Sequence, residues 1–172
     1  LCDSQSPLNI ASSLVPVDNL LMDLYMNPEA VMNLFDRIAE LLTEFYLLQW
    51  QMTGECLVKP GHGFASSRSF SGNGFSDDTI TMVSPELYQS YIQPSLVRSG
   101  IPFGGVAFHS CGNWTQFIDT VVNIPDLLTA DAAFSGETDP DPNPCEPFAG
   151  AFADSGIVLN ARIVGNVETV AE

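Results

Sequence analysis

The stretch GGVAFHSCGN, residues 104–113, decides how the fold is interpreted. Its first part is a run of small, apolar and β-branched residues, which is typical of a buried strand, and the pair Gly112-Asn113 indicates a turn. Successive side chains of a strand point to opposite faces, so His109 and Cys111 are expected to point the same way.

An imidazole and a thiolate side by side at the end of a strand provide half of a zinc site. Two ligands are not four, however, and the same pair could be a core cysteine beside a hydrogen-bonded histidine. The spacing of His109 and Cys111 alone leaves both interpretations open.

The clearest predicted helix covers residues 28–53. Asn27 can cap it, Pro28 suits its first position, and Gly54 ends it. Apolar residues recur at helical spacing over residues 31–48, so one broad face is expected to be buried.

The other predicted elements alternate between strand and helix. Ser84 and Pro85 begin one helix by the same cap-and-proline pattern, and Pro94 should kink or end it. Strands are expected over residues 7–15, 55–59, 104–111, 127–134 and 156–165, and helices over 114–122 and 148–152. The Gly- and Ser-rich stretch 66–74 is expected to be a functional or mobile loop, and the Pro- and Asp-rich stretch 137–147 a loop.

This alternation predicts an α/β fold with about five βα units on a parallel sheet. A closed barrel needs eight units in about 250 residues, so the 172 residues would hold part of a (β/α)8 TIM barrel. Because the chain lacks an initiator Met and capping patterns at its ends, we expect residues 1–172 to be one domain, truncated at both ends.

Composition narrows the class of protein. With 45% hydrophobic residues, the chain is long and apolar enough for one sizeable core. The formal net charge of −16 argues against nucleic acid and anionic membrane surfaces as partners, and no run is apolar enough to span a membrane. Four cysteines without regular spacing favour a reducing compartment, and we expect the cytoplasm.

Several segments together resemble the uroporphyrinogen decarboxylase superfamily, which includes tetrapyrrole decarboxylases and zinc-dependent corrinoid methyltransferases. Their order and spacing match over nearly the whole chain. The segments are SPLNIAS (6–12), NPE (27–29) with its long helix, SDD (76–78), SPELY (84–88) with Pro94, and FHSCGN (108–113).

The resemblance implies a (β/α)8 barrel with its site at the carboxyl ends of the strands. In the methyltransferase branch, His-x-Cys supplies two zinc ligands, which correspond to His109 and Cys111, and a later Cys supplies a third. Cys145 is the candidate for that ligand, although it lies in an Asn-Pro-Cys context and not in the family's Gly-Cys-Gly-like turn. Cys56 and His62, near another strand end, are alternatives.

The resemblance also implies the chemistry. A small-molecule thiol would be activated by zinc and methylated by a methylated corrinoid, which a corrinoid protein could carry as partner. Asp77 and Asp78 match a superfamily motif that faces the cleft, Asp78 as a catalytic and Asp77 as a substrate-binding residue, or they form a turn. His62 could transfer protons, or it could be an ordinary surface histidine.

Two other functions stay open. A true uroporphyrinogen decarboxylase of porphyrin biosynthesis needs no cofactor, but its carboxylate-rich substrate calls for cations, and this chain has only five Lys and Arg residues. Arg68 and Arg162 are the candidates to bind an anion. The third possibility is a barrel without catalysis that binds a small molecule, or one whose zinc is purely structural.

Overall fold

Four parallel strands form one sheet in the computed structural model, which describes residues 4–61 and 63–165. The strands are neighbours in the order in which they occur along the chain, as expected for consecutive βα units. Their bounds are β1 (Asn73–Ser76), β2 (Val106–His109), β3 (Leu127–Ala133) and β4 (Val158–Arg162).

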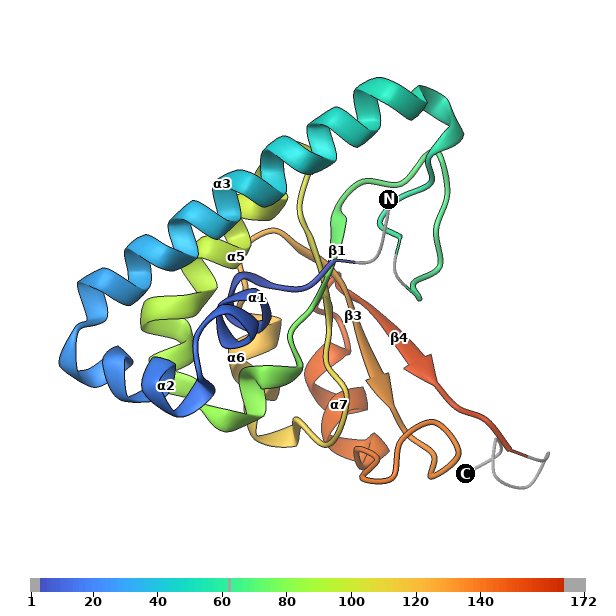
Figure 1. Ribbon diagram of the computed structural model, residues 1–172. Coiled ribbons are helices and arrows are strands. Elements are labelled where there is room, and N and C mark those ends of the chain that lie inside the picture. The colour runs from blue at the N-terminus through green and yellow to red at the C-terminus, as the bar shows by residue number, and fades with distance from the viewer. Residues whose placement is uncertain (1–3, 62, 166–172) are drawn as a thin grey trace.

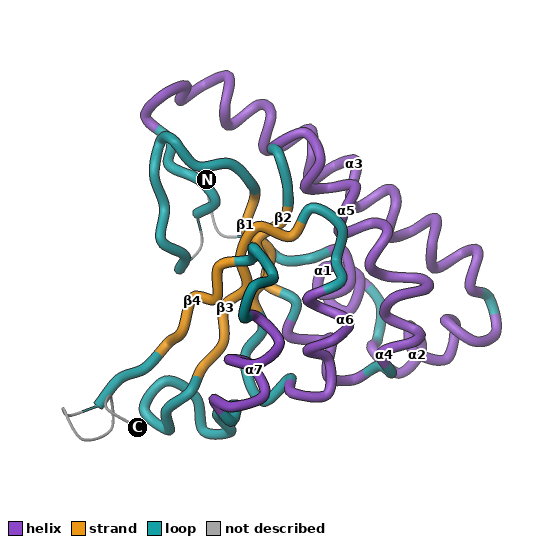
Figure 2. The backbone as a smooth tube through the Cα atoms, turned by 180° about the vertical axis from the view of Figure 1, so that it is seen from behind, coloured by secondary structure: helices purple, strands orange, loops and turns teal. Residues whose placement is uncertain are grey.

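The helices cover one face of this sheet (Figures 1 and 2). The longest, α3, packs against α1, α2 and α5. The α-helices are α1 (Pro7–Leu14), α2 (Val17–Met26), α3 (Pro28–Thr53), α4 (Pro85–Leu87), α5 (Gln93–Gly100), α6 (Ile118–Val122) and α7 (Cys145–Phe152). Short 3-10 turns are η1 (Gly54–Cys56), η2 (Asp78–Met82), η4 (Ile101–Phe103) and η5 (Thr115–Phe117), and η3 (Tyr88–Ile92) is a π-helix.

The core lies between the sheet and the helices and is rich in aromatic side chains. Phe108 of β2 contacts Trp114 edge to face at 5.5 Å, and Trp114 contacts Phe148 of α7 at 4.5 Å. Toward the β1 edge of the sheet, the rings of Tyr46 of α3 and Phe75 of β1 also meet edge to face, with centroids 6.5 Å apart. Edge-to-face contacts of this kind favour one arrangement of the elements.

The fold confirms the prediction of an α/β chain with a parallel sheet, and many elements lie where the sequence predicts them. The helix over residues 28–53 and its end at Gly54 agree with α3, although the Asn27 side chain bonds Asp23 and does not cap the helix. The predicted strands over 104–111, 127–134 and 156–165 contain β2, β3 and β4.

The strand predicted over residues 7–15 is wrong, because this segment is the helix α1. Ser6 accepts a hydrogen bond from the amide of Asn9, and Pro7 occupies the first turn. This is the same Ser-Pro start that correctly predicts the helix after Ser84. The extended residues come just before it, where Gln5 bridges in parallel to Ser76 at the free edge of β1.

The strand predicted over residues 55–59 is also wrong. The segment begins as η1, and only Lys59 makes a bridge, to Ser67, within the same loop. Among residues 4–61 and 63–165, no strand of the sheet pairs with this segment. The loop predicted over 66–74 does contain the start of β1, whose Gly- and Ser-rich sequence shows no strand pattern.

Pro94 does not end its helix. The run changes from α4 to the π-helix η3 and returns to α-helix at Gln93. A proline has no amide hydrogen and its ring crowds the preceding turn, and the wider π-turn accommodates both.

None of the helices within residues 4–61 and 63–165 combines the length and the apolar character needed to cross a membrane.

Candidate metal centre

The register of the sheet brings four polar side chains into one row at the carboxyl ends of the strands. Ser76 of β1 pairs with His109 of β2. The row continues from His109 to Asp131 of β3 and from there to Asn160 of β4. Because the strands are parallel, the loops that follow them all leave from this edge, which is where α/β folds place their sites.

Asp78, His109 and Cys111 bring their ligand atoms together at this edge. One carboxylate oxygen, one ring nitrogen and the thiol sulfur lie within 4.8 Å of one another, the only such group found among the described residues. The Cys111 sulfur is 3.4 Å from His109 Nε2, and Asp78 Oδ1 is 3.8 Å from the same nitrogen. The third ligand atom beside His109 and Cys111 therefore comes from Asp78.

The orientation of His109 is set by Asp131. His109 Nδ1 lies 2.5 Å from Asp131 Oδ1, and Asp131 is only 1% exposed. A carboxylate can only accept, so Nδ1 carries a hydrogen toward Asp131, and Nε2 is the ring nitrogen that faces Cys111 and Asp78. This is the arrangement by which carboxylates orient metal-binding histidines.

Asp131 is itself held from the last strand. Asn160 donates a hydrogen bond of 3.2 Å to Asp131 Oδ2. Arg162 Nε lies 2.9 Å from the same oxygen, an ion pair by distance, although Nε and Nη2 make no hydrogen bond. Asp131 thus supports the His109 imidazole directly, and Asn160 and Arg162 in turn support Asp131.

The Asp78 carboxylate is held in its charged form. Burial alone would raise its pKa, but hydrogen bonds from the Cys111 amide at 2.6 Å and the Ser76 hydroxyl at 3.0 Å outweigh it. The nearby His109 acts in the same direction, and the net result is a pKa below the ordinary value. Asp78 is therefore anionic at neutral pH.

The Cys111 thiol has the opposite tendency. Burial raises its pKa first, and the negative charge of Asp78 raises it further. Without a bound cation this thiol keeps its proton at neutral pH. A cation next to Cys111 and Asp78 would offset both effects, since a coordinating thiol is deprotonated outright.

Asp77 points away from this group. It is fully buried, and its two carboxylate oxygens accept 2.6 Å hydrogen bonds from the Ser6 and Tyr88 hydroxyls. Burial raises its pKa to about 6, the two hydrogen bonds oppose that rise, and the charge of Asp78 adds to it. The side chain joins α1 to the helix after Ser84, and in this position it has no surface to offer a substrate.

The other predicted site residues lie apart. Cys145 is an exposed first residue of α7 and is not one of the grouped ligands. Arg68 is exposed on the loop before β1 and lines a different cavity from the metal group. Cys56 is exposed in η1, and His62 lies outside the described residues.

Asp131 is the functional residue that sequence reasoning missed. It is the one charged residue in the apolar segment LLTADAAF, residues 127–134, and a charge inside a buried strand needs a partner. That signal could have singled it out. Its partner could not be named, since the register between β2 and β3 is not written in the local sequence.

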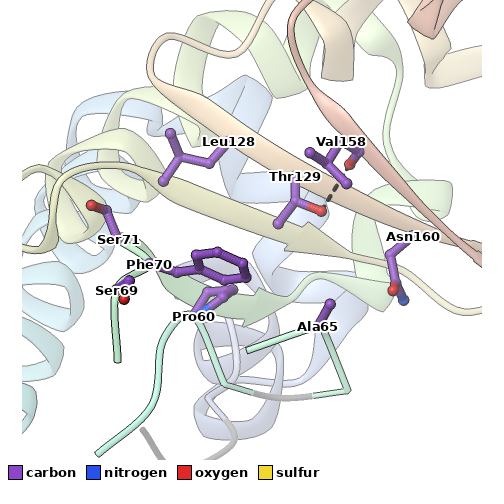
Figure 3. A pocket seen from close by; sticks show the side chains of 9 residues that line it. All are labelled: Pro60, Ala65, Ser69, Phe70, Ser71, Leu128, Thr129, Val158 and Asn160. Atoms are coloured by element: carbon purple, nitrogen blue, oxygen red, sulfur yellow. Dashed lines mark hydrogen bonds between the residues drawn. The ribbon is translucent and has the colours of Figure 1, made fainter. Parts of the chain in front are cut away.

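A cavity of about 420 Å³ lies on the sheet face opposite the helices (Figure 3). Leu128, Thr129 and Val158 form its floor, and Phe70 of the preceding loop lies over them. Asn160 lines one end of this cavity and also donates to Asp131, so the cavity adjoins the residues that support His109.

Comparison of the chain with models of protein families, with curated proteins and with solved structures finds no match.

Proposed function

We propose that this chain carries the metal centre of a zinc-dependent enzyme that methylates a thiol. The observation that supports the proposal is the convergence of Asp78, His109 and Cys111, with His109 oriented by the buried Asp131. The methylated corrinoid as donor, and a corrinoid protein as partner, rest on the resemblance of the sequence to the uroporphyrinogen decarboxylase superfamily.

The donor atoms suit zinc. Sulfur, imidazole nitrogen and carboxylate oxygen are its usual protein ligands. Tetrahedral zinc at its usual bond lengths holds a sulfur and a nitrogen ligand about 3.6 Å apart, and a nitrogen and an oxygen about 3.4 Å apart. The corresponding separations are 3.4 Å for Cys111 and His109 and 3.8 Å for Asp78 and His109.

Three protein ligands would leave one position for a substrate. A zinc ion bound in this way supplies the Lewis acidity that turns a thiol into a thiolate at neutral pH. The protein's own part is to orient the His109 ring through Asp131, so that Nε2 faces the site, and to keep Asp78 charged. The Cys111 amide, by donating to Asp78, holds these two residues together.

We also propose that the sheet is part of a (β/α)8 barrel. In its favour, the strands are parallel and consecutive, the helices lie on one face, and the polar row lies at the carboxyl ends. The extended residues 4–6 add a fifth parallel position beside β1. At the other edge of the sheet, Val158 of β4 is 63% exposed, as expected of a strand whose barrel neighbour is not described.

Decarboxylation of a carboxylate-rich substrate is less well supported by the charges around the site. Asp78 belongs to the candidate metal centre and Asp139 accepts the amide of neighbouring Gly112, whereas the nearby cation Arg162 already faces the buried Asp131. A substrate with several carboxylates would be repelled by this surface.

The test is the zinc content of the complete, natively purified protein, by elemental analysis. We expect about one zinc per chain, lost in His109→Ala with Cys111→Ala and strongly reduced in Asp78→Asn. Cys145→Ser is the matched control, since Cys145 is a cysteine outside the ligand group. Stoichiometric zinc in the double variant, or loss of zinc in Cys145→Ser with full retention in Asp78→Asn, would contradict this ligand set.

Methyl transfer is then measured with methylcobalamin as donor and a small thiol as acceptor. We expect turnover with the zinc-loaded protein and none with the double variant. Zinc binding without any thiol methylation would retain the metal centre and reject the proposed reaction.

A further inference from the structure

A second cavity, of about 310 Å³, lies where α3 ends and the loop toward β1 begins. Trp50, Leu57, Lys59 and Arg68 line it. This loop leads into the amino-terminal end of β1, whereas the metal ligands follow the carboxyl ends of the strands (Figure 1). The cavity is therefore a different site from the candidate metal centre.

The charges in this cavity are unusual for such an acidic protein. The chain has 21 acidic and only five basic residues, so each cation has many possible partners. Lys59 and Arg68 nevertheless make no ion pair with any described residue, although Glu55 lines the same cavity. The other three cations are all paired: Arg37 with Glu40, Arg98 with Asp36 and Arg162 with Asp131.

One of these two cations, Lys59, lies over an aromatic ring. The Lys59 ammonium lies 3.9 Å from the centroid of the Trp50 ring, and that ring is 37% exposed. Arg68 is exposed, lines the same cavity and follows Ser67, which is bridged to Lys59, and its guanidinium carries five donors. A cavity of this size is at the lower end of the range for small-molecule sites.

We propose that this cavity binds a phosphomonoester on a flat apolar body. A phosphate of this kind carries about −1.5 to −2 charges at neutral pH, which matches the two cations. The Arg68 fork suits phosphate oxygens in a bidentate manner, and Lys59 serves as a point charge. Leu57 and the part of Trp50 that Lys59 leaves exposed provide the surface for the apolar part, and the site does not depend on the metal centre.

The probe is phenyl phosphate, with inorganic phosphate and phenol as its two halves. Binding is followed by calorimetry and by the fluorescence of Trp50, because the other tryptophan, Trp114, is fully buried. We expect saturable binding of phenyl phosphate, weaker binding of inorganic phosphate, and none of phenol at the same concentrations. The affinity should fall as salt is added.

The variants give changes of opposite sign. Arg68→Gln should weaken binding about tenfold, since a charge-assisted contact is lost. Glu55→Gln should tighten it roughly threefold, because a competing negative charge leaves the cavity. Arg37→Gln removes an exposed cation that pairs elsewhere and is expected to leave binding unchanged.

The proposal is overturned by absence of saturable phenyl phosphate binding to the intact protein. It is equally overturned if Lys59→Gln with Arg68→Gln binds phenyl phosphate as tightly as the unchanged chain. Equal affinities for phenyl phosphate and phenol would show that the ring alone is recognised, which also rejects a phosphate site.

Discussion

Asp77 and Asp78 are neighbours in the chain, but their carboxylates have different surroundings. Asp78 turns to the metal group and accepts the Cys111 amide, and its pKa is lowered. Asp77 turns into the core, where its carboxylate accepts hydrogen bonds from the Ser6 and Tyr88 hydroxyls. At the residue scale, two identical side chains thus take a ligand role and a structural role.

The raised pKa of Asp77 predicts a dependence of stability on pH. Its pKa is about 6 in the folded protein against an ordinary 3.8, so between these values the folded state binds more protons than the unfolded chain. The stability that depends on Asp77 is highest below about pH 4 and falls as the pH rises through about 6. The lowered pKa of Asp78 acts in the opposite sense and must be separated by a variant.

Asp77→Asn imitates the protonated acid, so it should stabilise the protein by on the order of 2–3 kcal/mol above pH 6 and by little near pH 4. Urea unfolding from pH 4 to 7.5 measures this difference, with Asp18→Asn on the surface of α2 as control. If Asp77→Asn and the unchanged chain keep parallel profiles over this range, the assigned pKa is wrong.

Asp131 provides a second prediction, on metal affinity. Asp131→Asn leaves all three ligands in place but no longer offers His109 a charged acceptor. Zinc affinity should fall about 10- to 100-fold. Competition with a chromophoric chelator measures it, and the exposed Asp119→Asn should behave like the unchanged chain. An unaltered zinc affinity would remove Asp131 from the proposed support of His109.

At the scale of elements, two helix starts share one pattern but differ in what they hold. Ser6 and Ser84 both precede a proline, and both side chains accept the amide three residues later. Ser6 is also fully buried and donates to the buried Asp77, whereas the second partner of the Ser84 side chain is the exposed Glu86 in the same turn. The Ser-Pro motif is therefore a helix cap at Ser84, and at Ser6 it is a helix cap that also bonds a buried core residue.

Ser84→Ala should destabilise the protein by about 1 kcal/mol, the usual cost of a lost cap. Ser6→Ala should cost about 2–4 kcal/mol, because the loss of a cap is added to the loss of a donor from buried Asp77. Urea unfolding at pH 7 compares the two variants directly. Equal losses would mean that the bond from Ser6 to Asp77 contributes little.

At the scale of the whole molecule, charge opposes the compact state. The formal net charge is −16, and three of the five cations are already paired locally. Most acidic side chains are therefore left to repel one another across the surface. This repulsion reaches far at low ionic strength and is short-ranged at high ionic strength.

Adding salt should therefore stabilise the protein. The Debye length falls from about 30 Å at 0.01 M to about 8 Å at 0.15 M, so the thermal midpoint should rise by a few degrees over this range. Calorimetry at pH 7.5 with sodium chloride checks this, and an equal osmolality of sucrose separates screening from solute exclusion. A midpoint that falls with salt would indicate that attractive ion pairs outweigh the repulsion.

The sequence predicts the elements whose signal is repeated and local. The apolar spacing over residues 31–48 specifies α3, and the apolar run before His109 specifies β2. It fails for residues 7–15, where the apolar content was given more weight than the Ser-Pro start, and it misses β1, whose four residues NGFS carry no strand pattern. In β1, pairing with β2 and with residues 4–6 overrides weak propensity.

The sequence by itself determined the features that depend on residues close to one another along the chain. His109 and Cys111 are two residues apart at the end of β2 and lie together, although β2 itself ends at His109. The helix starts follow from serine and proline in adjacent positions. Only the tertiary structure decided that Asp78 joins this pair, that Asp131 orients it from 22 residues away, and that Asp77 does neither. The physical reason is that sheet register and helix packing set distances between segments, and these depend on the burial of the whole core and not on any local spacing.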